Sequence, residues 1–263
     1  MNKKTILITG AASGIGRETA LFFAQNGWFT GIFDVNEEGL KTLDKEIGTG
    51  NCFSGIMNVA APDSVRQGVT SLMSETGGRL DVLLNNAGIL DFGLFETVPL
   101  ERHHRVVDVN VKGILNMVYF CLPYLKKTSG ARIINLSSIS SLYGVPELGV
   151  YSATKHTVTG ITEFLDIELE PYGIKVCDIR PPYVNTPMLD GGEEKKSMKA
   201  LKLMGGFGYI KPEIVVKTIW KAAHKNRRHW NIGLTKLMVL QFWAAPYSKR
   251  FGMKFLAMPK LNH

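Results

Sequence analysis

The stretch YSATK, residues 151–155, places a phenol and an ammonium four positions apart. Positions i and i+4 lie on the same face of a helix, so Tyr151 and Lys155 would share one site there. A free phenol titrates near pH ~10, and a nearby cation favours the phenolate and lowers that pKa. The pair therefore suits general acid–base chemistry. An ordinary helix with an aromatic residue inside and a lysine outside would carry the same pattern.

A cluster of hydroxyls precedes this pair in the segment NLSSISSLYG. A serine hydroxyl can hydrogen-bond a substrate oxygen on which negative charge develops. Serines in such clusters also form turns and helix caps, which is the alternative for each of them. The candidates are Ser137, Ser138, Ser140 and Ser141.

A glycine-rich turn, TGAASGIG at residues 9–16, directly follows the first apolar run of the chain. Gly10, Gly14 and Gly16 permit a tight turn, close approach of the backbone to a pyrophosphate, and close packing of helix on strand. The phosphates would then lie at the positive end of the next helix. No GK[ST] follows, which excludes a P-loop. The position between the first predicted strand and the first predicted helix indicates a dinucleotide site.

Asp34 ends the second predicted strand, eighteen residues beyond Gly16. A carboxylate there can accept hydrogen bonds from both ribose hydroxyls of an adenosine, and it repels a 2′-phosphate. Ser13 and Val35 occupy the positions where a cation could pair with that phosphate. The sequence therefore favours NAD(H) over NADP(H). The alternative interpretation of Asp34 is a helix cap after the strand.

Apolar strand patterns alternate with helical patterns along the chain. We expect strands in KTILIT, WFTGIFD, NCFSGIMNV, LDVLLNNAG, ARIINLSS and IKVCDIRP, and a long helix over roughly 100–127. Strands that are apolar on both faces and separated by helices indicate a parallel sheet covered on both sides. The predicted fold is α/β, a single-domain, Rossmann-like, doubly wound parallel sheet with helices on both faces, spanning 1–263.

Three motifs in this order resemble the short-chain dehydrogenases/reductases: the TGxxxGxG spacing, NNAG at 85–88, and YSATK. The resemblance covers roughly residues 4–190. It implies that Tyr151 is the general acid/base and that Lys155 is its electrostatic partner and a ribose ligand. It also selects Ser138, thirteen residues before the tyrosine, as the substrate-orienting serine, with Ser137 as the competitor.

The resemblance further implies that Asn110 holds a water in a proton relay to the lysine. An asparagine inside a helix is locally unfavourable, because its amide competes for backbone hydrogen bonds. The alternative is a solvent-facing asparagine. The cofactor-binding residues expected from the motifs and the resemblance are Gly10, Ser13, Gly14, Ile15, Gly16, Asp34, Asn58, Val59, Asn86, Ala87, Gly88, Tyr151, Lys155, Val184 and Thr186.

The chain departs from the family pattern at two places. Asn58 stands where an acid is usual at the adenine site, and its amide can still offer a carbonyl and an N–H. Pro182 stands where a glycine is usual, which fixes φ and removes a backbone donor. Val184 and Thr186, from which cofactor contacts are expected, follow this proline within four residues. Neither departure removes a catalytic group.

The predicted function is NAD(H)-dependent interconversion of a hydrophobic secondary alcohol and its ketone. The expected substrate walls, ILDFGLF at 89–95, SLYGVPELG at 141–149 and Tyr183, are mostly apolar, and we expect a methionine-rich flap at 187–210 to cover them. Two alternatives stay open: an epimerase or dehydratase on the same fold, and an NAD-binding regulatory protein without turnover. Proteins of the latter kind often lose the tyrosine or the lysine, and this chain has both.

The positive charge is concentrated at the C-terminal end. From Lys195 onward there are fifteen Lys and Arg and one acid, Glu213, which gives +14, so residues 1–194 carry −6 of the total of +8. The basic amphipathic extension 232–263 is expected to lie on an anionic membrane surface, cover a neighbouring subunit, close over the substrate or pack on its own domain. The basic residues form no recognised nucleic-acid-binding motif, so we expect no nucleic-acid partner. The resemblance implies a homodimer or homotetramer.

The remaining patterns exclude several classes. Three well-separated cysteines form no CxxC pair, and the adjacent His103 and His104 would face different directions on a helix, so we expect no metal. No apolar run reaches the roughly 18–20 residues of a membrane span, and the N-terminus lacks the apolar core of a signal peptide. We therefore expect a cytoplasmic protein, peripheral to the membrane if the extension binds lipid.

Overall fold

The computed structural model describes residues 3–187 and 209–244. Seven strands form one sheet in the order β3–β2–β1–β4–β5–β6–β7, and every neighbouring pair is parallel. The strands are β1 (Thr5–Thr9), β2 (Phe29–Asp34), β3 (Cys52–Ile56), β4 (Val82–Asn85), β5 (Arg132–Leu136), β6 (Lys175–Arg180) and β7 (His229–Asn231).

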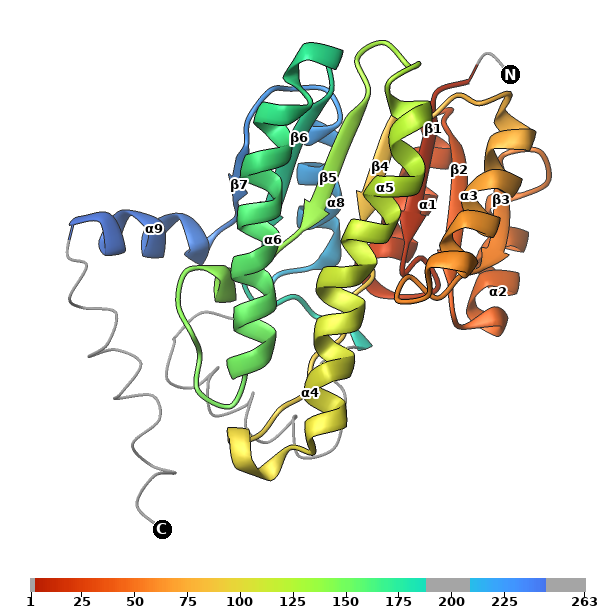
Figure 1. Ribbon diagram of the computed structural model, residues 1–263. Coiled ribbons are helices and arrows are strands. Elements are labelled where there is room, and N and C mark those ends of the chain that lie inside the picture. Colours follow the sequence, from red (N-terminus) through yellow and green to blue (C-terminus); the bar gives the residue numbers. More distant parts are fainter. Residues whose placement is uncertain (1–2, 188–208, 245–263) are drawn as a thin grey trace.

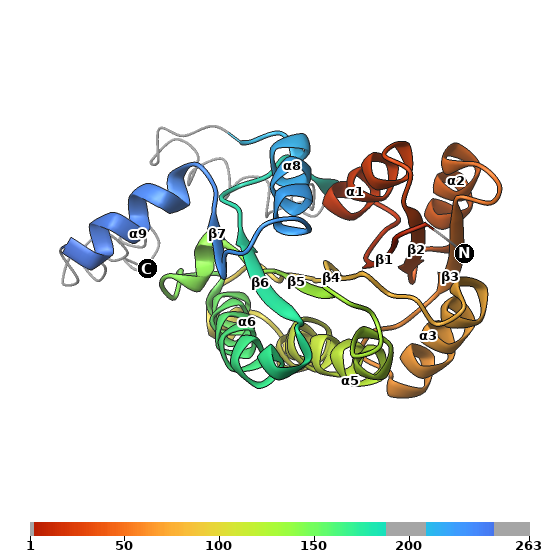
Figure 2. The ribbon, with the colours of Figure 1, turned by 90° about the horizontal axis from the view of Figure 1, so that it is seen from above.

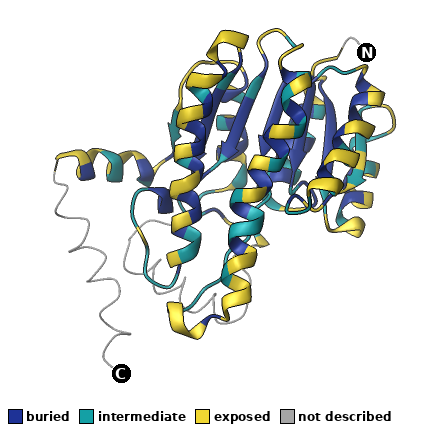
Figure 3. Ribbon diagram, viewed as in Figure 1, coloured by how far each residue is buried: buried dark blue, intermediate teal, exposed yellow. Residues whose placement is uncertain are grey.

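Helices cover both faces of the sheet, as Figure 2 shows from above. One face carries α1 (Gly14–Gln25), α2 (Glu37–Ile47) and α8 (Pro212–Ala222), and the other carries α3 (Pro62–Thr76), α5 (Gly113–Leu125) and α6 (Gly149–Glu168). The central strands alternate between these layers: in β1, Leu7 belongs to one apolar core and Ile6 and Ile8 to the other. The strands are consequently buried on both faces (Figure 3), which explains their continuous apolar runs.

The predicted doubly wound parallel sheet is confirmed, and all six predicted strands are present. β7, α8 and α9 (Leu234–Ala244) were not predicted. β7 has only three residues, HWN, each partly exposed, so it carries neither an apolar run nor an alternation. The organisation as one domain over 1–263 stays a prediction. The predicted flap lies, apart from its ends, outside the described residues, as does the extension beyond residue 244.

The predicted helix at 100–127 is continuous but not uniform. It consists of α4 (Leu100–Val107), a π-helical turn (Asp108–Lys112) and α5. Among the described residues it is the one helix whose length and composition would allow it to cross a membrane. Its buried side, which includes Ile114, Met117 and Cys121, belongs to the apolar core under the sheet. The apolar composition is thus that of a core helix, and it carries no argument for a membrane span.

The order of the strands also determines where a ligand can bind. From β1 the chain proceeds to β2 and β3 on one side, and it then returns to place β4 on the other side of β1. At such a switch point the loops after neighbouring strands diverge, and a crevice opens at the carboxyl ends of the strands. The glycine-rich turn follows β1, and NNAG includes the end of β4, so both motifs lie at this crevice.

Candidate active site

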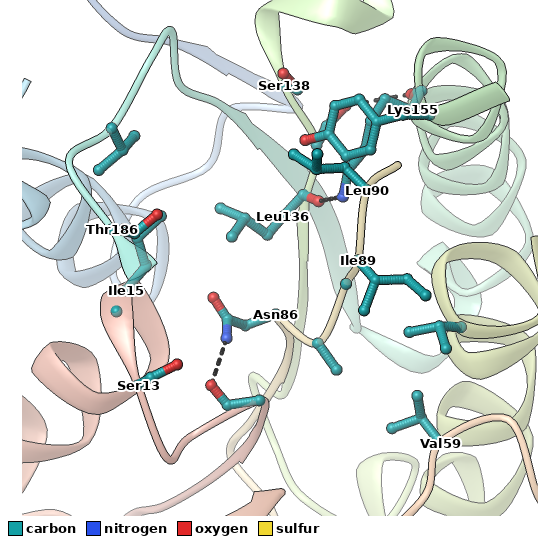
Figure 4. Close-up of a pocket in the computed structure, with 18 of the residues that line it drawn as sticks. Ser13, Ile15, Val59, Asn86, Ile89, Leu90, Leu136, Ser138, Lys155 and Thr186 are labelled. Carbon is teal, nitrogen blue, oxygen red and sulfur yellow. Dashed lines mark hydrogen bonds between the residues drawn. The ribbon is translucent and has the colours of Figure 1, made fainter. Parts of the chain in front are cut away.

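A cavity of about 640 Å³ lies at the carboxyl ends of β1 to β6 (Figure 4). It brings together nearly all residues predicted from the sequence, although they come from the ends of six different strands and from α6. Those that line it are Gly10, Ser13, Gly14, Ile15, Asp34, Asn58, Val59, Asn86, Ala87, Gly88, Ser138, Tyr151, Lys155, Val184 and Thr186. Gly16 and Asn110 do not line the cavity; both support its wall from behind.

The turn after β1 has the geometry of a phosphate cradle. Gly10 and Gly14 have positive φ angles of 66° and 54°, which glycine adopts without strain. A Cβ atom at Gly16 would lie 2.1 Å from the carbonyl oxygen of Gly10, so only glycine lets α1 begin this close to the turn. Ser13 is the N-cap residue of α1, and its side chain makes no capping hydrogen bond. The first turn of α1 is therefore open to an anionic group in the cavity.

Asp34 is fixed beside this turn rather than used as a helix cap. Its Oδ2 accepts a hydrogen bond from the backbone N–H of Ala12 at 3.0 Å, and its Oδ1 accepts one from Asn36 at 3.0 Å. The cap of α2 is Asn36, whose side chain accepts from Gly39. The capping alternative for Asp34 is thus wrong. Arg17, a cation near the start of α1, is paired with Glu46 and does not line the cavity.

Asn86 ties the end of β4 to the glycine-rich turn. Its Nδ2 donates hydrogen bonds to the carbonyl oxygens of Thr9 and Gly10, at 2.9 and 3.0 Å; Figure 4 draws one of the two. The Thr9 hydroxyl in turn accepts from the backbone N–H groups of Asn86 and Ala87. A Cβ atom at Gly10 would lie 2.9 Å from the Cα of Ala87. These contacts hold the two motifs together at the switch point.

Tyr151 and Lys155 lie on α6 at the other end of the cavity. The Lys155 Nζ is 5.5 Å from the centre of the Tyr151 ring, and it donates a hydrogen bond of 2.8 Å to the carbonyl oxygen of Leu136 (Figure 4). Only 5% of Lys155 is exposed, and this burial lowers its pKa to about 8. Loss of solvent also raises the pKa of Tyr151 to about 12, although a hydrogen bond with Ser138 lowers it.

The prediction that the lysine lowers the phenol pKa is therefore wrong for the protein by itself. Burial disfavours both charged forms, and the ammonium is directed to the Leu136 carbonyl rather than to the phenol oxygen. At neutral pH Tyr151 is consequently a phenol, the form that donates a proton. A second phenol, Tyr183, lies in the same cavity, and its proximity adds to the upward shift of the Tyr151 pKa.

The structure distinguishes the two competing serines. The Ser138 side chain is hydrogen-bonded to Tyr151 and accepts from the backbone N–H of Ser140 at 3.1 Å. Ser137 donates instead to the backbone carbonyl of Lys155 at 3.3 Å, so it supports α6. Ser138 is only 9% exposed and lines the same cavity as Tyr151. The spacing-based selection of Ser138 matches this geometry.

Asn110 lies in the π-helical turn and is 1% exposed, so the solvent-facing alternative is wrong. Its Oδ1 accepts from the N–H of Ile89, and its Nδ2 donates to the carbonyl of Ile89 and to the Thr154 hydroxyl. The side chain thereby clamps the loop after β4 onto α6. A Cβ atom at Gly88 would lie 3.3 Å from Asn110 Oδ1 and 3.6 Å from Lys155 Nζ, so the two polar groups are neighbours. The predicted water relay between them stays a prediction.

Some residues of the cavity were not predicted from the sequence. The Leu136 carbonyl, which holds Lys155, belongs to the backbone and so carries no signal in its residue type. Arg105 and Asp108 lie five and two positions before Asn110 on the same continuous helix, and their presence on that helix was the available signal. Pro182 lines the cavity without displacing Val184, because Val184 is bridged to Ile210. The departure from the usual glycine therefore leaves the predicted wall in place.

Comparisons with known proteins agree with this geometry. A family model described as short chain dehydrogenase matches residues 4–197. A 3-oxoacyl-[acyl-carrier-protein] reductase of Thermotoga maritima is 37% identical over 82% of this chain and 88% of its own length. A cyclohexanol dehydrogenase of an Acinetobacter species is 34% identical, with 83% and 86% covered. The crystal structure of 3-ketoacyl-(acyl-carrier-protein) reductase from Brucella melitensis complexed with NADH has a TM-score of 0.77 and 28% identity, and 87% of this chain and 96% of that chain are covered.

Proposed function

Because this chain belongs to the short-chain dehydrogenase family and is an oxidoreductase of that family, we propose that it interconverts a hydrophobic secondary alcohol and its ketone with NAD(H). One observation carries the proposal. Tyr151, Ser138 and Lys155 converge at one end of the cavity whose other end is formed by the glycine-rich turn and Asp34. A proton donor and a nucleotide site thus share one enclosed space. We place the enzyme in the cytoplasm.

The residues present fit a nicotinamide dinucleotide. The turn from Gly10 to Gly16 and the start of α1 would hold the pyrophosphate, Asp34 the adenosine ribose, and Lys155 the nicotinamide ribose. The bound cofactor supplies or accepts the hydride. In reduction, Tyr151 donates its phenol proton to the carbonyl oxygen, while the Ser138 hydroxyl donates a hydrogen bond to that oxygen as charge develops. In oxidation, Tyr151 must first lose its own proton, and the resulting phenolate takes the proton of the substrate hydroxyl.

The substrate end of the cavity is mainly apolar. Ile89, Leu90, Ile139 and Leu148 line it together with Tyr183. Apolar walls with a few placed polar groups favour a hydrophobic ligand oriented by one reactive oxygen. The relative from Acinetobacter is named for a cyclic secondary alcohol, which supports this substrate class.

Absorbance of NADH during incubation with a panel of alcohols and ketones tests the proposed function. We expect turnover of aliphatic and aryl ketones to exceed that of small polar sugars, because the latter would leave hydroxyls unpaired against apolar walls. Faster turnover of sugars would contradict the substrate class. Formation of an epimerised or dehydrated product without net change in NADH would instead identify the alternative chemistry on the same fold.

Exchanging the residues beside the adenosine ribose is expected to invert the coenzyme preference. The double variant Asp34→Ser with Val35→Arg removes the charge that repels a 2′-phosphate and adds a cation to pair with it. We expect kcat/KM to fall for NADH and to rise for NADPH, each by about ten-fold or more, since a charge-assisted hydrogen bond contributes about 1.5–3 kcal/mol. Initial rates with each coenzyme provide the measurement.

The matched control is Asp63→Ser, which removes an exposed carboxylate at the start of α3 that does not line the cavity. It should leave the coenzyme ratio unchanged. A wild-type enzyme that uses NADPH as well as NADH would contradict the proposed preference directly.

We also propose the homodimer or homotetramer that the family resemblance implies. Exposed apolar side chains lie on the outer surfaces of α5 and α6, which run side by side on the same face of the sheet (Figure 2). Burial of such a surface against a second copy would remove it from water. The side chains are Leu115 and Tyr119 on α5 and Phe164 and Ile167 on α6.

A further inference from the structure

The last described helix, α9, presents apolar side chains to solvent. It extends away from the sheet beyond β7 (Figures 1 and 2). Leu237, Leu240 and Trp243 are 57%, 63% and 82% exposed. Their spacing of three residues places them along one side of the helix. A tryptophan and two leucines in a row on a projecting helix are more than the scattered apolar residues of an ordinary surface.

The chain that leads into this row is strongly basic. The described residues 214–244 contain six Lys and Arg and no Asp or Glu. One of these cations, Arg228, is paired with Asp166 on α6. An apolar row flanked by cations has the composition of a helix that lies in the headgroup region of an anionic bilayer. A second copy of the same surface would bring two such charge clusters together, which electrostatic repulsion disfavours.

The base of α9 adjoins the wall of the cavity. Gly233 directly precedes the helix, and a Cβ atom there would lie 3.8 Å from Cγ of Pro182. Pro182 lines the cavity next to Tyr183, the second phenol near Tyr151. A membrane or protein that binds α9 would therefore lie close to the substrate site, because the residue before α9 packs against Pro182 in the cavity wall.

We propose that α9 is a docking helix for membranes rich in anionic phospholipid, and that the enzyme acts on an alcohol or ketone dissolved in that membrane. Leu237, Leu240 and Trp243 enter the interface, and the flanking lysines and arginines bind the lipid phosphates and carboxylates. The docking itself is independent of catalysis. The substrate class rests on the proposed function, because it requires a hydrophobic alcohol or ketone to reach Tyr151.

Flotation of the full-length protein with vesicles tests the docking. One vesicle preparation contains phosphatidylcholine alone, and the other contains phosphatidylcholine mixed with phosphatidylserine. We expect the wild type to float with the anionic vesicles and to be released by high salt, because the attraction between exposed charges is screened. Leu240→Ser and Trp243→Ser should each weaken binding by about ten-fold or more, the effect of leaving one large apolar side chain out of the interface.

The matched control is Leu100→Ser, which changes a similarly exposed apolar residue on α4 and should float as the wild type does. Flotation unaffected by both α9 substitutions, or equal binding to both kinds of vesicle, would overturn the docking. Absence of flotation together with a dimer that Trp243→Ser dissociates would assign the row to a second copy instead.

The substrate class has its own measurement. With a water-soluble ketone, Leu240→Ser should turn over as fast as the wild type; with a long-chain ketone incorporated in anionic vesicles, it should be about ten-fold slower. Equal rates on the vesicle substrate would overturn the substrate class and leave the docking intact. Lack of turnover of every ketone by the wild type would contradict the proposed function, and the flotation result would still decide the docking.

Discussion

Replacement of Tyr151 by Phe is expected to lower kcat by about 10²- to 10⁴-fold, the usual contribution of a positioned general acid or base. The substitution removes only the phenol oxygen and keeps the ring that packs in the cavity wall. Affinity for NADH should therefore change little. Initial rates followed by NADH absorbance give kcat, and quenching of protein fluorescence by NADH gives the dissociation constant. The two measurements together distinguish loss of the proton donor, which lowers kcat alone, from disruption of the site, which also weakens NADH binding.

Tyr172→Phe is the matched control for this substitution. Tyr172 is 51% exposed, lies against Lys126 rather than in the cavity, and loses the same single oxygen. Its kcat should equal that of the wild type. Unchanged turnover in Tyr151→Phe would mean that another group moves the proton. Tyr183 would then be the first residue to examine, because its phenol lies in the same cavity.

Most of the site could be predicted because its residues follow the ends of strands that the sequence marks clearly. Gly10, Asp34 and Asn86 each come at or directly after the end of an apolar run, and the parallel sheet brings those ends to one edge. Contacts with backbone atoms were beyond prediction, since any residue type can supply them. The Leu136 carbonyl that holds Lys155 is the clearest example.

The roles of side chains were predicted less completely than their positions. The spacing of Tyr151 and Lys155 predicted that they share one helix face. The direction of the shift in the Tyr151 pKa depends on burial, which is known only once the chain is folded. Asn110 shows the same limit. Its unfavourable place inside a helix marked it as functional, and the structure adds that it clamps Ile89 and Thr154 from a π-helical turn.

Replacement of Lys155 by Met is expected to lower kcat/KM by about 10²-fold or more, in the range that electrostatic stabilisation contributes at such sites. Methionine fills a similar volume but supplies neither the charge nor the donor to the Leu136 carbonyl. The substitution should also change how stability depends on pH. In the cofactor-free protein the folded state lowers the pKa of Lys155 from 10.5 to about 8.

The sign of the pH effect follows from proton binding. Between about pH 8 and 10.5 the unfolded chain carries a proton on Lys155 that the folded chain has lost, so the free energy of unfolding rises with pH. Above about pH 10 the raised pKa of Tyr151 acts in the opposite direction, because the folded state then retains the phenol proton. The contribution of Lys155 is therefore best separated between pH 8 and 10.

Over this interval the wild type should gain about 2 kcal/mol of stability relative to Lys155→Met. Urea unfolding of both cofactor-free proteins, monitored by tryptophan fluorescence, measures the difference. If the free energies of unfolding of the two proteins changed equally with pH across this interval, Lys155 would not be desolvated, and the assignment of its lowered pKa would be wrong. The expected result means that the buried charge of Lys155 reduces folding stability below pH 8. The protein bears this cost at the end of the cavity where Tyr151 moves the proton.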